Sequence, residues 1–361
     1  MKNAVIIGEY SRQGGGTKFL HDVYHSLENE YSIYLITDRK FRQNDLNFHS
    51  VINTSYEYYE GIPLYRLYPR VMRLKNELSD IVHGLSGDIV LNLHPNIFIY
   101  RGDVNYLHGF SFLDPLIDEY GNIKNKFLFL MIKYSGIFKI YNDARFLTHG
   151  KYTRDISMKM FPILGIKYGS IDYITLPVSI PRVELNLDRI NDVLIFGRIN
   201  RNKGIDDAIH IASRMPGKSF IIAGAVNEGD EDYVSSLEGM NMGNVKFIVN
   251  PSEEEKINLF RESSVYLHLN RKEHFGNTVA EAVWMGAIPV VPESGGPWID
   301  IIEQGRYGFG YRDIDGAVDS IRQALDADSS FRRDVYISGE RFSFPRFRDA
   351  FLSYLDDVLE G

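Results

Sequence analysis

The chain has 361 residues, which is longer than a typical domain with one hydrophobic core and suits two domains. Hydrophobic residues make up 44% of it and charged residues 24%, the balance of a soluble globular protein. The absence of cysteine excludes disulfides and thiolate metal sites, and the net charge of −8 disfavours general binding of nucleic acid.

The charge is unevenly divided along the chain. Residues 1–180 hold 20 lysines and arginines against 18 acids, whereas residues 181–361 hold 20 against 30. The first half therefore tolerates or requires positive charge.

The first apolar run, residues 4–7, is only four residues long and is followed by Gly8 and Glu9. It is too short for a signal peptide and is typical of a first β-strand. No stretch reaches the length of a transmembrane helix. We therefore expect a cytoplasmic protein, with the cytoplasmic face of a membrane as a second expected location.

Strand-like and helix-like segments alternate along the chain. Apolar, β-rich runs lie at residues 4–9, 32–37, 88–94, 104–109, 145–150 and 172–179, and they resume at 192–197, 218–224, 245–250, 265–270 and 287–293. Segments of helical period, such as 204–215 and 253–264, lie between them. This alternation predicts parallel sheets that are covered by helices on both faces.

A polar, proline-containing stretch at residues 180–191 divides the pattern into two halves. We predict an α/β protein of two Rossmann-like domains, residues 1–180 and 181–342, that face each other across a central cleft. The last segment, residues 343–361, is predicted to be an amphipathic helix that packs back on the first domain. Ligands of such sheets bind at the carboxyl ends of the strands.

The loop after the first strand contains Gly15 and Gly16 within "GEYSRQGGGTKFL". It is not a Walker loop, because no Gly-Lys-Ser/Thr is present, and it lacks the third glycine of a dinucleotide fingerprint. The missing fingerprint disfavours a two-domain dehydrogenase. Further along, His94 and His108 lie at predicted strand ends, where either could be structural or functional.

Residues 124–141 form a basic and aromatic segment without any acid. It contains Lys124, Lys126, Phe127, Phe129, Lys133, Tyr134, Phe138, Lys139 and Tyr141. The lysines exclude a fully apolar membrane span, but such a helix can lie in the interface of an anionic bilayer. The alternative is a core helix with a solvated lysine edge.

A first charged motif lies in "LIFGRINRNKGIDDAI", a predicted strand, turn and helix. Arg198 and Lys203 lie in or beside the turn, and Gly197 and Gly204 flank it. Two fixed cations at the carboxyl end of a strand can neutralise a diphosphate without a metal. Taken alone, the pair would be an ordinary surface charge cluster in most proteins.

A second motif, "KEHFGNTVAEAVWM", places Glu273 and Glu281 around a turn at Gly276 and the start of a predicted helix. The free N–H groups of a helix start suit a phosphate, and glycine lets a ligand approach the backbone closely. The two carboxylates suit sugar hydroxyls on either side of that phosphate, which predicts a nucleotide diphosphate sugar as ligand. The alternative is that Glu281 is simply solvated.

Two later features have a structural interpretation beside a functional one. Gly295, Gly296 and Pro297 could start another helix and shape the floor of the ligand site, or they could form a tight turn without a ligand. Asp313 and Asp315 form an Asp-x-Asp, as in metal-dependent transferases, but their position before a helical segment favours helix capping.

"EHFGNTVAE" and "FGRINRNKG" together resemble the two-glutamate and Arg…Lys motifs of the retaining GT-B glycosyltransferases of family 4. The run "EHFGNTVAEAVWMGAIPVVPESGGPWIDII" is most similar to that of the dolichol-linked oligosaccharide α-mannosyltransferases that use GDP-mannose. The likeness covers most of residues 192–305, and the N-terminal half resembles the family in outline.

The resemblance implies roles for the matching positions. Glu273 would contact the transferred hexose and stabilise charge at its anomeric carbon, and Glu281 would bind the ribose. The leaving diphosphate would be stabilised by Arg198 and Lys203. The remaining donor contacts would come from the backbone around Phe275, Gly276, Asn277 and Thr278, with the base near Ile248, Val249 and Asn250.

In the first domain, the resemblance carries the phosphate and acceptor loop to Gly15 and Gly16, and the histidine beside the reacting sugar to His108. It implies a nucleotide sugar and a glycan or lipid-linked acceptor as partners, and no cofactor or metal. Two alternatives stay open: a UDP-glucose or UDP-GlcNAc transferase with a soluble acceptor, and a nucleotide-sugar-binding subunit without turnover.

Overall fold

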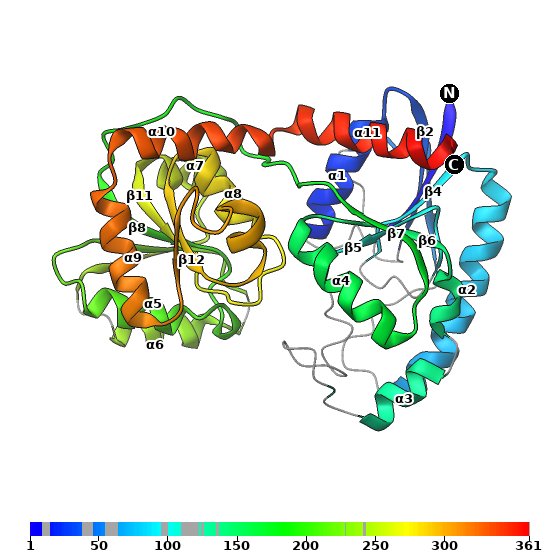
Figure 1. Ribbon diagram of the computed structural model, residues 1–361, viewed down its shortest axis with the longest axis horizontal. Helices are drawn as coiled ribbons and strands as arrows, with labels where there is room; N and C mark the ends of the chain where they lie inside the picture. Colours follow the sequence, from blue (N-terminus) through cyan, green and yellow to red (C-terminus); the bar gives the residue numbers. More distant parts are fainter. Residues whose placement is uncertain are drawn as a thin grey trace. The chain divides into compact units, whose positions relative to one another are not determined.

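The computed structural model describes residues 1–8, 15–37, 46–54, 64–94, 100–109, 123, 126–134, 137–227, 229–240 and 243–360. The chain divides into two compact units. One comprises Met1–Leu176 together with Phe344–Gly361, and the other is Pro177–Ser343. Each unit has its own parallel sheet (Figure 1).

The described residues of the first unit form a seven-stranded sheet in the order β3-β2-β1-β4-β5-β6-β7. Its strands are β1 (Lys2–Ile7), β2 (Tyr31–Thr37), β3 (Ser50–Asn53), β4 (Ile89–Asn92), β5 (Val104–Leu107), β6 (Ala144–Thr148) and β7 (Tyr168–Tyr173). All neighbouring strands pair in parallel. The central strands are apolar runs because both faces of a parallel sheet are covered.

The helices of this unit are α1 (Gly15–Leu27), α2 (Leu64–Leu85), α3 (Lys126–Tyr134), α4 (Lys151–Leu164) and α11 (Phe344–Glu360), with a 3₁₀ turn at Ile137–Tyr141. The last helix, α11, packs beside α1, so the two ends of the chain belong to one unit (Figure 1). Phe347 of α11 meets Phe19 of α1 edge to face, and Arg145 donates to the carbonyl of Val358 at 2.8 Å.

The second unit contains a six-stranded sheet in the order β10-β9-β8-β11-β12-β13. Its strands are β8 (Asn191–Phe196), β9 (Phe220–Gly224), β10 (Val245–Val249), β11 (Ser263–Leu267), β12 (Ile288–Pro292) and β13 (Phe309–Tyr311), and all pairs are parallel. Its helices are α5 (Ile205–Ser213), α6 (Glu231–Met240), α7 (Glu253–Glu262), α8 (Asn277–Trp284), α9 (Ile314–Asp326) and α10 (Ser329–Ser338). Short helical turns lie at Arg201–Lys203, Pro297–Ile301 and Gly339–Phe342.

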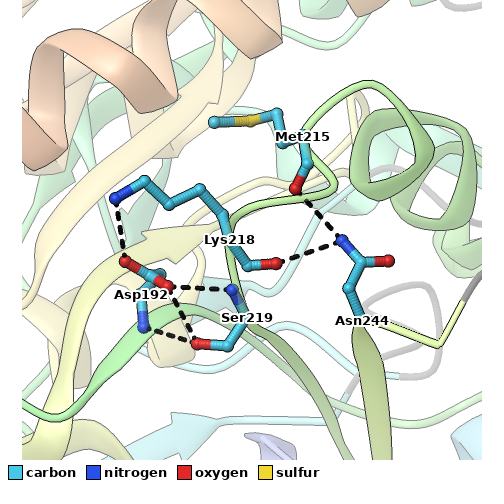
Figure 2. Close-up of polar contacts among 5 residues, drawn as sticks. All are labelled: Asp192, Met215, Lys218, Ser219 and Asn244. Atoms are coloured by element: carbon cyan, nitrogen blue, oxygen red, sulfur yellow. Dashed lines mark hydrogen bonds and ion pairs between the residues drawn. The ribbon is translucent and has the colours of Figure 1, made fainter.

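Hydrogen bonds from polar side chains connect the amino ends of β8, β9 and β10 (Figure 2). The Asp192 carboxylate accepts from the backbone N–H of Ser219 at 2.8 Å and from the ammonium of Lys218 at 3.3 Å. The Asn244 amide donates to the carbonyls of Lys218 and Met215 at 3.0 and 3.2 Å. This network lies at the end of the sheet away from the carboxyl ends of the strands, so it holds the sheet without occupying the ligand-binding edge.

Candidate functional site

The strand order of the second unit creates a switch point between β8 and β11. These strands are neighbours in the sheet, but the chain leaves them toward opposite sides, β8 toward β9 and β11 toward β12. Such a point leaves a crevice at the carboxyl ends of the two strands. A cavity of about 200 Å³ lies there, and its polar lining includes Arg198, Lys203, His268, Asn270, Glu273 and Thr278.

Glu273 is held in this cavity by two donors. Its Oε2 accepts from Asn270 Nδ2 at 2.9 Å and from Lys203 Nζ at 3.2 Å. In the described part of the chain, Oε1 has no hydrogen-bond donor. Burial by itself would raise the pKa of Glu273, but Lys203, His268 and the Asn270 amide together hold that pKa below its usual value. The side chain is therefore an ionised acceptor.

The two predicted cations both reach this cavity. Lys203 ends the short 3₁₀ turn after β8, and Gly204, with φ of +70°, starts α5 directly behind it. Arg198 is exposed and forms no ion pair with any residue that the structure describes. Positive charge is therefore available beside Glu273.

The first glycine turn places a helix start against the same cavity. Gly276 has φ of +95° and precedes α8, a conformation that favours glycine. The N–H groups of Val279 and Ala280 both donate to the Gly276 carbonyl. Within the described ranges, the backbone N–H groups of Asn277 and Thr278 have no hydrogen-bond acceptor, and both residues line the cavity.

The second glycine turn lies directly against the first one. Gly296 donates its N–H to the carbonyl of Glu273 at 2.9 Å, and a Cβ at Gly296 would lie 2.0 Å from the His274 oxygen. A Cβ at Gly295 would lie 2.6 Å from the Glu273 oxygen. A helical turn does start here, at Pro297–Ile301. The turn therefore supports the backbone that carries Glu273. A side chain at Gly295 or Gly296 would displace that backbone.

Glu281 does not line this cavity, unlike the expectation that it would face the same space as Glu273. It is buried in α8 and its Oε1 accepts from Lys256 of α7 at 2.9 Å. The reason lies in the geometry of the helix. Asn277 lines the cavity, and Glu281 lies four residues later on the same face, one turn farther along.

The other predicted donor residues lie around the cavity or beyond it. Thr278 accepts a hydrogen bond from the Tyr266 hydroxyl at 2.6 Å, and Phe275 is buried against Phe342. Val249 and Asn250 are outside the cavity lining, as is Ile248. Val249 is exposed at the end of β10, whereas the Asn250 side-chain oxygen accepts from the Val226 N–H at 3.1 Å.

Three residues of this region were not predicted from the sequence: Asn270, Lys256 and His268. His268 follows β11, lines the cavity and is buried. Burial lowers its pKa to about 4, so the ring is neutral near pH 7. Asn270 and His268 could have been noticed as polar residues in the apolar run "VYLHLN". Lys256 gave no signal, because it is distant from Glu281 in the sequence.

In the first unit, Gly15 and Gly16 are the first two residues of α1, and the loop at residues 9–14 lies outside the described residues. His108 follows β5, and its Nε2–H donates to the Leu93 carbonyl at 2.9 Å. The ring packs against Tyr106 and Phe19, and burial lowers its pKa. His94, the competing histidine, is buried after β4.

The basic segment at residues 124–141 forms α3 and the following 3₁₀ turn, although Lys124 lies outside the described residues. Phe129 and Tyr141 are buried in the core, and Lys126 and Lys139 are exposed. No helix found in the described ranges is long and apolar enough to cross a membrane.

The Asp-x-Asp pair has structural partners. Asp313 is the N-cap of α9, and its carboxylate accepts from the Gly316 N–H at 2.8 Å. Asp315, in the first turn, forms an ion pair with Arg214. The prediction that this motif caps a helix is therefore confirmed.

The sequence of residues 180–341 matches the family model described as "Glycosyl transferases group 1". Residues 180–341 are a glycosyltransferase group 1 domain. Every polar residue named above in the cavity lining falls within this glycosyltransferase domain. The resemblance based on the Glu273 and Arg198 motifs is thus confirmed for the part of the chain that carries them.

Curated relatives of the glycosyltransferase domain include proteins named "GDP-Man:Man(3)GlcNAc(2)-PP-Dol alpha-1,2-mannosyltransferase". The chain is 32% identical to the one from Mus musculus over 154 residues, which is 39% of this chain and 31% of the relative. It is 24% identical to the one from Dictyostelium discoideum over 302 residues, 76% of this chain and 57% of the relative. The matches thus span about a third to somewhat over half of these relatives' lengths.

Among solved structures, the sucrose-phosphate synthase from Thermosynechococcus elongatus is similar over 100% of both chains, with a TM-score of 0.73 and 14% identity. At this identity the likeness shows the fold alone. It confirms the predicted fold class, an α/β protein of the GT-B type with two Rossmann-like units. The cleft expected between the units stays a prediction.

Proposed function

We propose that the chain is a retaining glycosyltransferase that moves mannose from GDP-mannose to a glycan or lipid-linked acceptor and requires no metal. One observation carries the proposal. The Glu273 carboxylate is held at the β8/β11 switch point by Lys203 and Asn270, beside the start of α8. The name of these relatives supports the choice of GDP-mannose as donor and of a lipid-linked acceptor.

The donor would place its transferred sugar against Glu273 and its distal phosphate at the start of α8. The open Oε1 of Glu273 would accept from a sugar hydroxyl, and the N–H groups of Asn277 and Thr278 would donate to phosphate oxygens. Arg198 and Lys203 would face the diphosphate. Lys203 can serve both groups, since an ammonium has three donors and uses one on Glu273.

In the proposed reaction the acceptor oxygen bonds to the anomeric carbon as the bond from that carbon to the diphosphate oxygen breaks. The acceptor hydroxyl gives its proton to the leaving diphosphate on the same face, so configuration is retained. The protein's main task is electrostatic, because negative charge grows on the diphosphate and positive charge on the sugar. Arg198 and Lys203 stabilise the first charge and Glu273 the second.

Metal independence rests on the same charges. Arg198 and Lys203, which both line the cavity, would neutralise the diphosphate in place of a divalent ion. The carboxylates of the Asp-x-Asp pair are engaged with Gly316 and Arg214. Turnover should therefore persist in EDTA, and a strict requirement for Mg²⁺ or Mn²⁺ would contradict this part of the proposal.

The first unit would supply the acceptor site, with His108 beside the reacting sugar and Gly15 and Gly16 near the phosphates. A basic and apolar surface on the same unit suits an acceptor held in an anionic membrane. On α3, Leu130 is 47% and Tyr134 79% exposed, with Lys126 beside them. The C-terminal part of α4 adds Met158, Lys159 and Ile163, all exposed.

The two helices adjoin, because the Lys133 side chain of α3 lies 3.8 Å from the place of a Cβ at Gly165, just after α4. Aromatic and aliphatic side chains among lysines are the composition that binds anionic bilayer interfaces. We therefore propose that this α3–α4 surface, made of Lys126, Leu130, Lys133, Tyr134, Met158, Lys159 and Ile163, rests on the membrane.

A thermal-shift screen of nucleotide sugars tests the donor. A ligand at 100 times its Kd stabilises the folded protein by about 2.7 kcal/mol, which raises the melting temperature measurably. GDP-mannose should do so more than UDP-glucose, UDP-GlcNAc or an ADP-sugar. Stabilisation by a UDP-sugar alone would replace this donor with the UDP-dependent alternative.

A further inference from the structure

A buried tyrosine hydroxyl connects the end of β8 to the start of α8. Tyr266 of β11 is 1% exposed and lines the cavity that contains Glu273. Its hydroxyl lies 3.1 Å from the carbonyl oxygen of Phe196, the last residue of β8, and 2.6 Å from Oγ1 of Thr278, in the first turn of α8. Phe196 and Thr278 line the same cavity. The three groups therefore form one network at the switch point between β8 and β11.

The hydrogens of this network have two possible arrangements. Burial raises the pKa of Tyr266, so its hydroxyl keeps its single hydrogen at neutral pH. If that hydrogen goes to the Phe196 carbonyl, Thr278 has to donate its own hydrogen to Tyr266, because two oxygens this close share a hydrogen. Thr278 then offers only lone pairs to the cavity. If the Tyr266 hydrogen goes to Thr278, the hydrogen of Thr278 is left for another acceptor.

The Thr278 hydroxyl has no second partner among the residues that the structure describes. A threonine in a helix can donate to a carbonyl three or four residues earlier, but no such bond forms within the described ranges. The backbone N–H groups of Asn277 and Thr278 lack acceptors there as well. One hydroxyl and two N–H groups at one helix start make a set of three donors, which suits the oxygens of a phosphate.

A second buried group indicates that this cavity takes a polar ligand. His268 is 7% exposed and lines the cavity, and its Nε2 has no hydrogen-bond partner in the part of the chain that the structure describes. Buried polar atoms are normally hydrogen-bonded. Arg198 and Lys203 add positive charge to the same lining. The donors around Thr278 therefore lie in a cavity whose other groups also suit a polar anion.

We infer that Tyr266 is a positioning residue for the distal phosphate of the donor, because its hydroxyl donates to Thr278 and so leaves the Thr278 hydroxyl to donate to that phosphate. The inference rests on the proposed function, which takes the start of α8 as the phosphate site. It adds a side-chain donor to the two backbone N–H groups. It also adds a residue, Tyr266, that acts through Thr278 and does not touch the donor.

Calorimetric binding of GDP and GMP to the full chain tests the inference, because only GDP carries the distal phosphate. Tyr266→Phe removes one oxygen and keeps the ring. It should weaken GDP binding about threefold to tenfold, the scale of one hydrogen bond between uncharged groups, since the Thr278 hydroxyl is then neither oriented nor polarised. Binding of GMP should stay within about twofold of the wild type.

The Thr278 hydroxyl can be removed without a change of shape. Thr278→Val should weaken GDP binding about tenfold or more, because it removes a hydrogen bond to a charged acceptor. The Tyr266 hydroxyl keeps the Phe196 carbonyl as acceptor in this variant, so no buried donor is left unpaired. Thr278→Ser keeps the hydroxyl and should stay within about threefold of the wild type.

A double-mutant cycle separates action through Thr278 from an independent effect. Tyr266→Phe added to Thr278→Val should cost less than about twofold more GDP affinity. Tyr233→Phe is the matched control, because it removes a buried hydroxyl that donates to Asp206 at 2.6 Å, outside the cavity lining. It should leave both affinities unchanged. Unfolding midpoints are measured first, and Tyr266→Met replaces Tyr266→Phe in the cycle if the latter does not fold.

The outcomes distinguish two failures. UDP and UMP are measured in the same way to cover the alternative donor. If neither diphosphate binds the wild type more tightly than its monophosphate, the phosphate site of the proposed function is wrong. If the wild type prefers the diphosphate and Tyr266→Phe keeps that preference, the inference alone fails. It also fails if Tyr266→Phe weakens diphosphate and monophosphate equally, or if the two losses in the cycle add, because a merely structural role gives these results.

Discussion

The ammonium of Lys203 lies 3.2 Å from Oε2 of Glu273, so a cation and a carboxylate from two neighbouring strand ends meet in one cavity. Lys203 follows β8 and Glu273 follows β11, which are hydrogen-bonded neighbours in the sheet. Opposite charges at one strand edge suit a ligand with an anionic end and a hydroxyl-rich end. The relationship makes several outcomes measurable.

Removal of either cation should slow sugar transfer. Lys203→Ala and Arg198→Ala should each lower turnover by roughly tenfold to a thousandfold, the scale of losing one oriented charge stabiliser. Steady-state assays with saturating donor measure the effect. Arg201→Ala is the matched control, because Arg201 lies in the same 3₁₀ turn but stacks on Tyr233, outside the cavity lining. Full activity in the Lys203 variant would refute the diphosphate site.

The glycine turn behind Glu273 should be intolerant of a methyl group. Gly296→Ala would place its Cβ 2.0 Å from the His274 carbonyl oxygen, so the backbone of residues 273–275 must move. We expect turnover to fall by about tenfold or more, because catalytic groups must keep their geometry closely. Gly217→Ala has open space around its Cβ and should retain normal rates. Equal activity of the two variants would show that the turn is not a support.

Stability should depend on pH through Asp22 of α1. Burial raises the pKa of this carboxyl from 3.8 to about 6, against the opposing effects of Lys18 and His25. Between these two values the unfolded chain has already released the proton that the folded protein keeps. Rising pH therefore costs the folded state free energy over this window, by about 3 kcal/mol at most.

Asp22→Asn should remove that cost. Relative to the wild type, its free energy of unfolding should rise by up to about 3 kcal/mol between pH 4 and pH 7. Urea titrations at pH 4, 5, 6 and 7 give the difference directly. A difference that stays constant across these pH values would mean that Asp22 titrates normally in the folded protein.

The α3–α4 surface should bind anionic vesicles. The wild type should sediment with liposomes that contain anionic lipid at low salt. Lys126→Glu with Lys159→Glu, one exposed residue from each helix, should reduce binding by tenfold or more, since each lysine near such a surface contributes about 1 kcal/mol.

A control variant with the same change of charge, Lys246→Glu with Arg333→Glu, alters exposed residues of the other unit and should sediment like the wild type. If the wild type stays in the supernatant with anionic lipid present, the acceptor is soluble and the UDP-dependent alternative gains support.

The amino-acid sequence by itself determined the features that depend on near neighbours along the chain. Buried parallel strands need continuous apolar runs, so residues 192–197, 218–224 and 265–270 were recognisable as strands. Gly276 before a helix start and Asp313 as an N-cap are local geometries whose partners lie within three or four residues. The short edge strands Ser50–Asn53 and Phe309–Tyr311 were not predicted, because three or four residues are too few to show a strand's alternating pattern.

Only the tertiary structure decided which distant groups meet. The support of Glu273 by Gly296, the pairing of Glu281 with Lys256, and the joining of α3 to α4 all connect residues that are far apart in the chain. Glu281 has the same local spacing whether it faces the cavity, solvent or another helix. Its partner was set by the packing of α7 against α8, and helical period alone does not specify which element covers a given face.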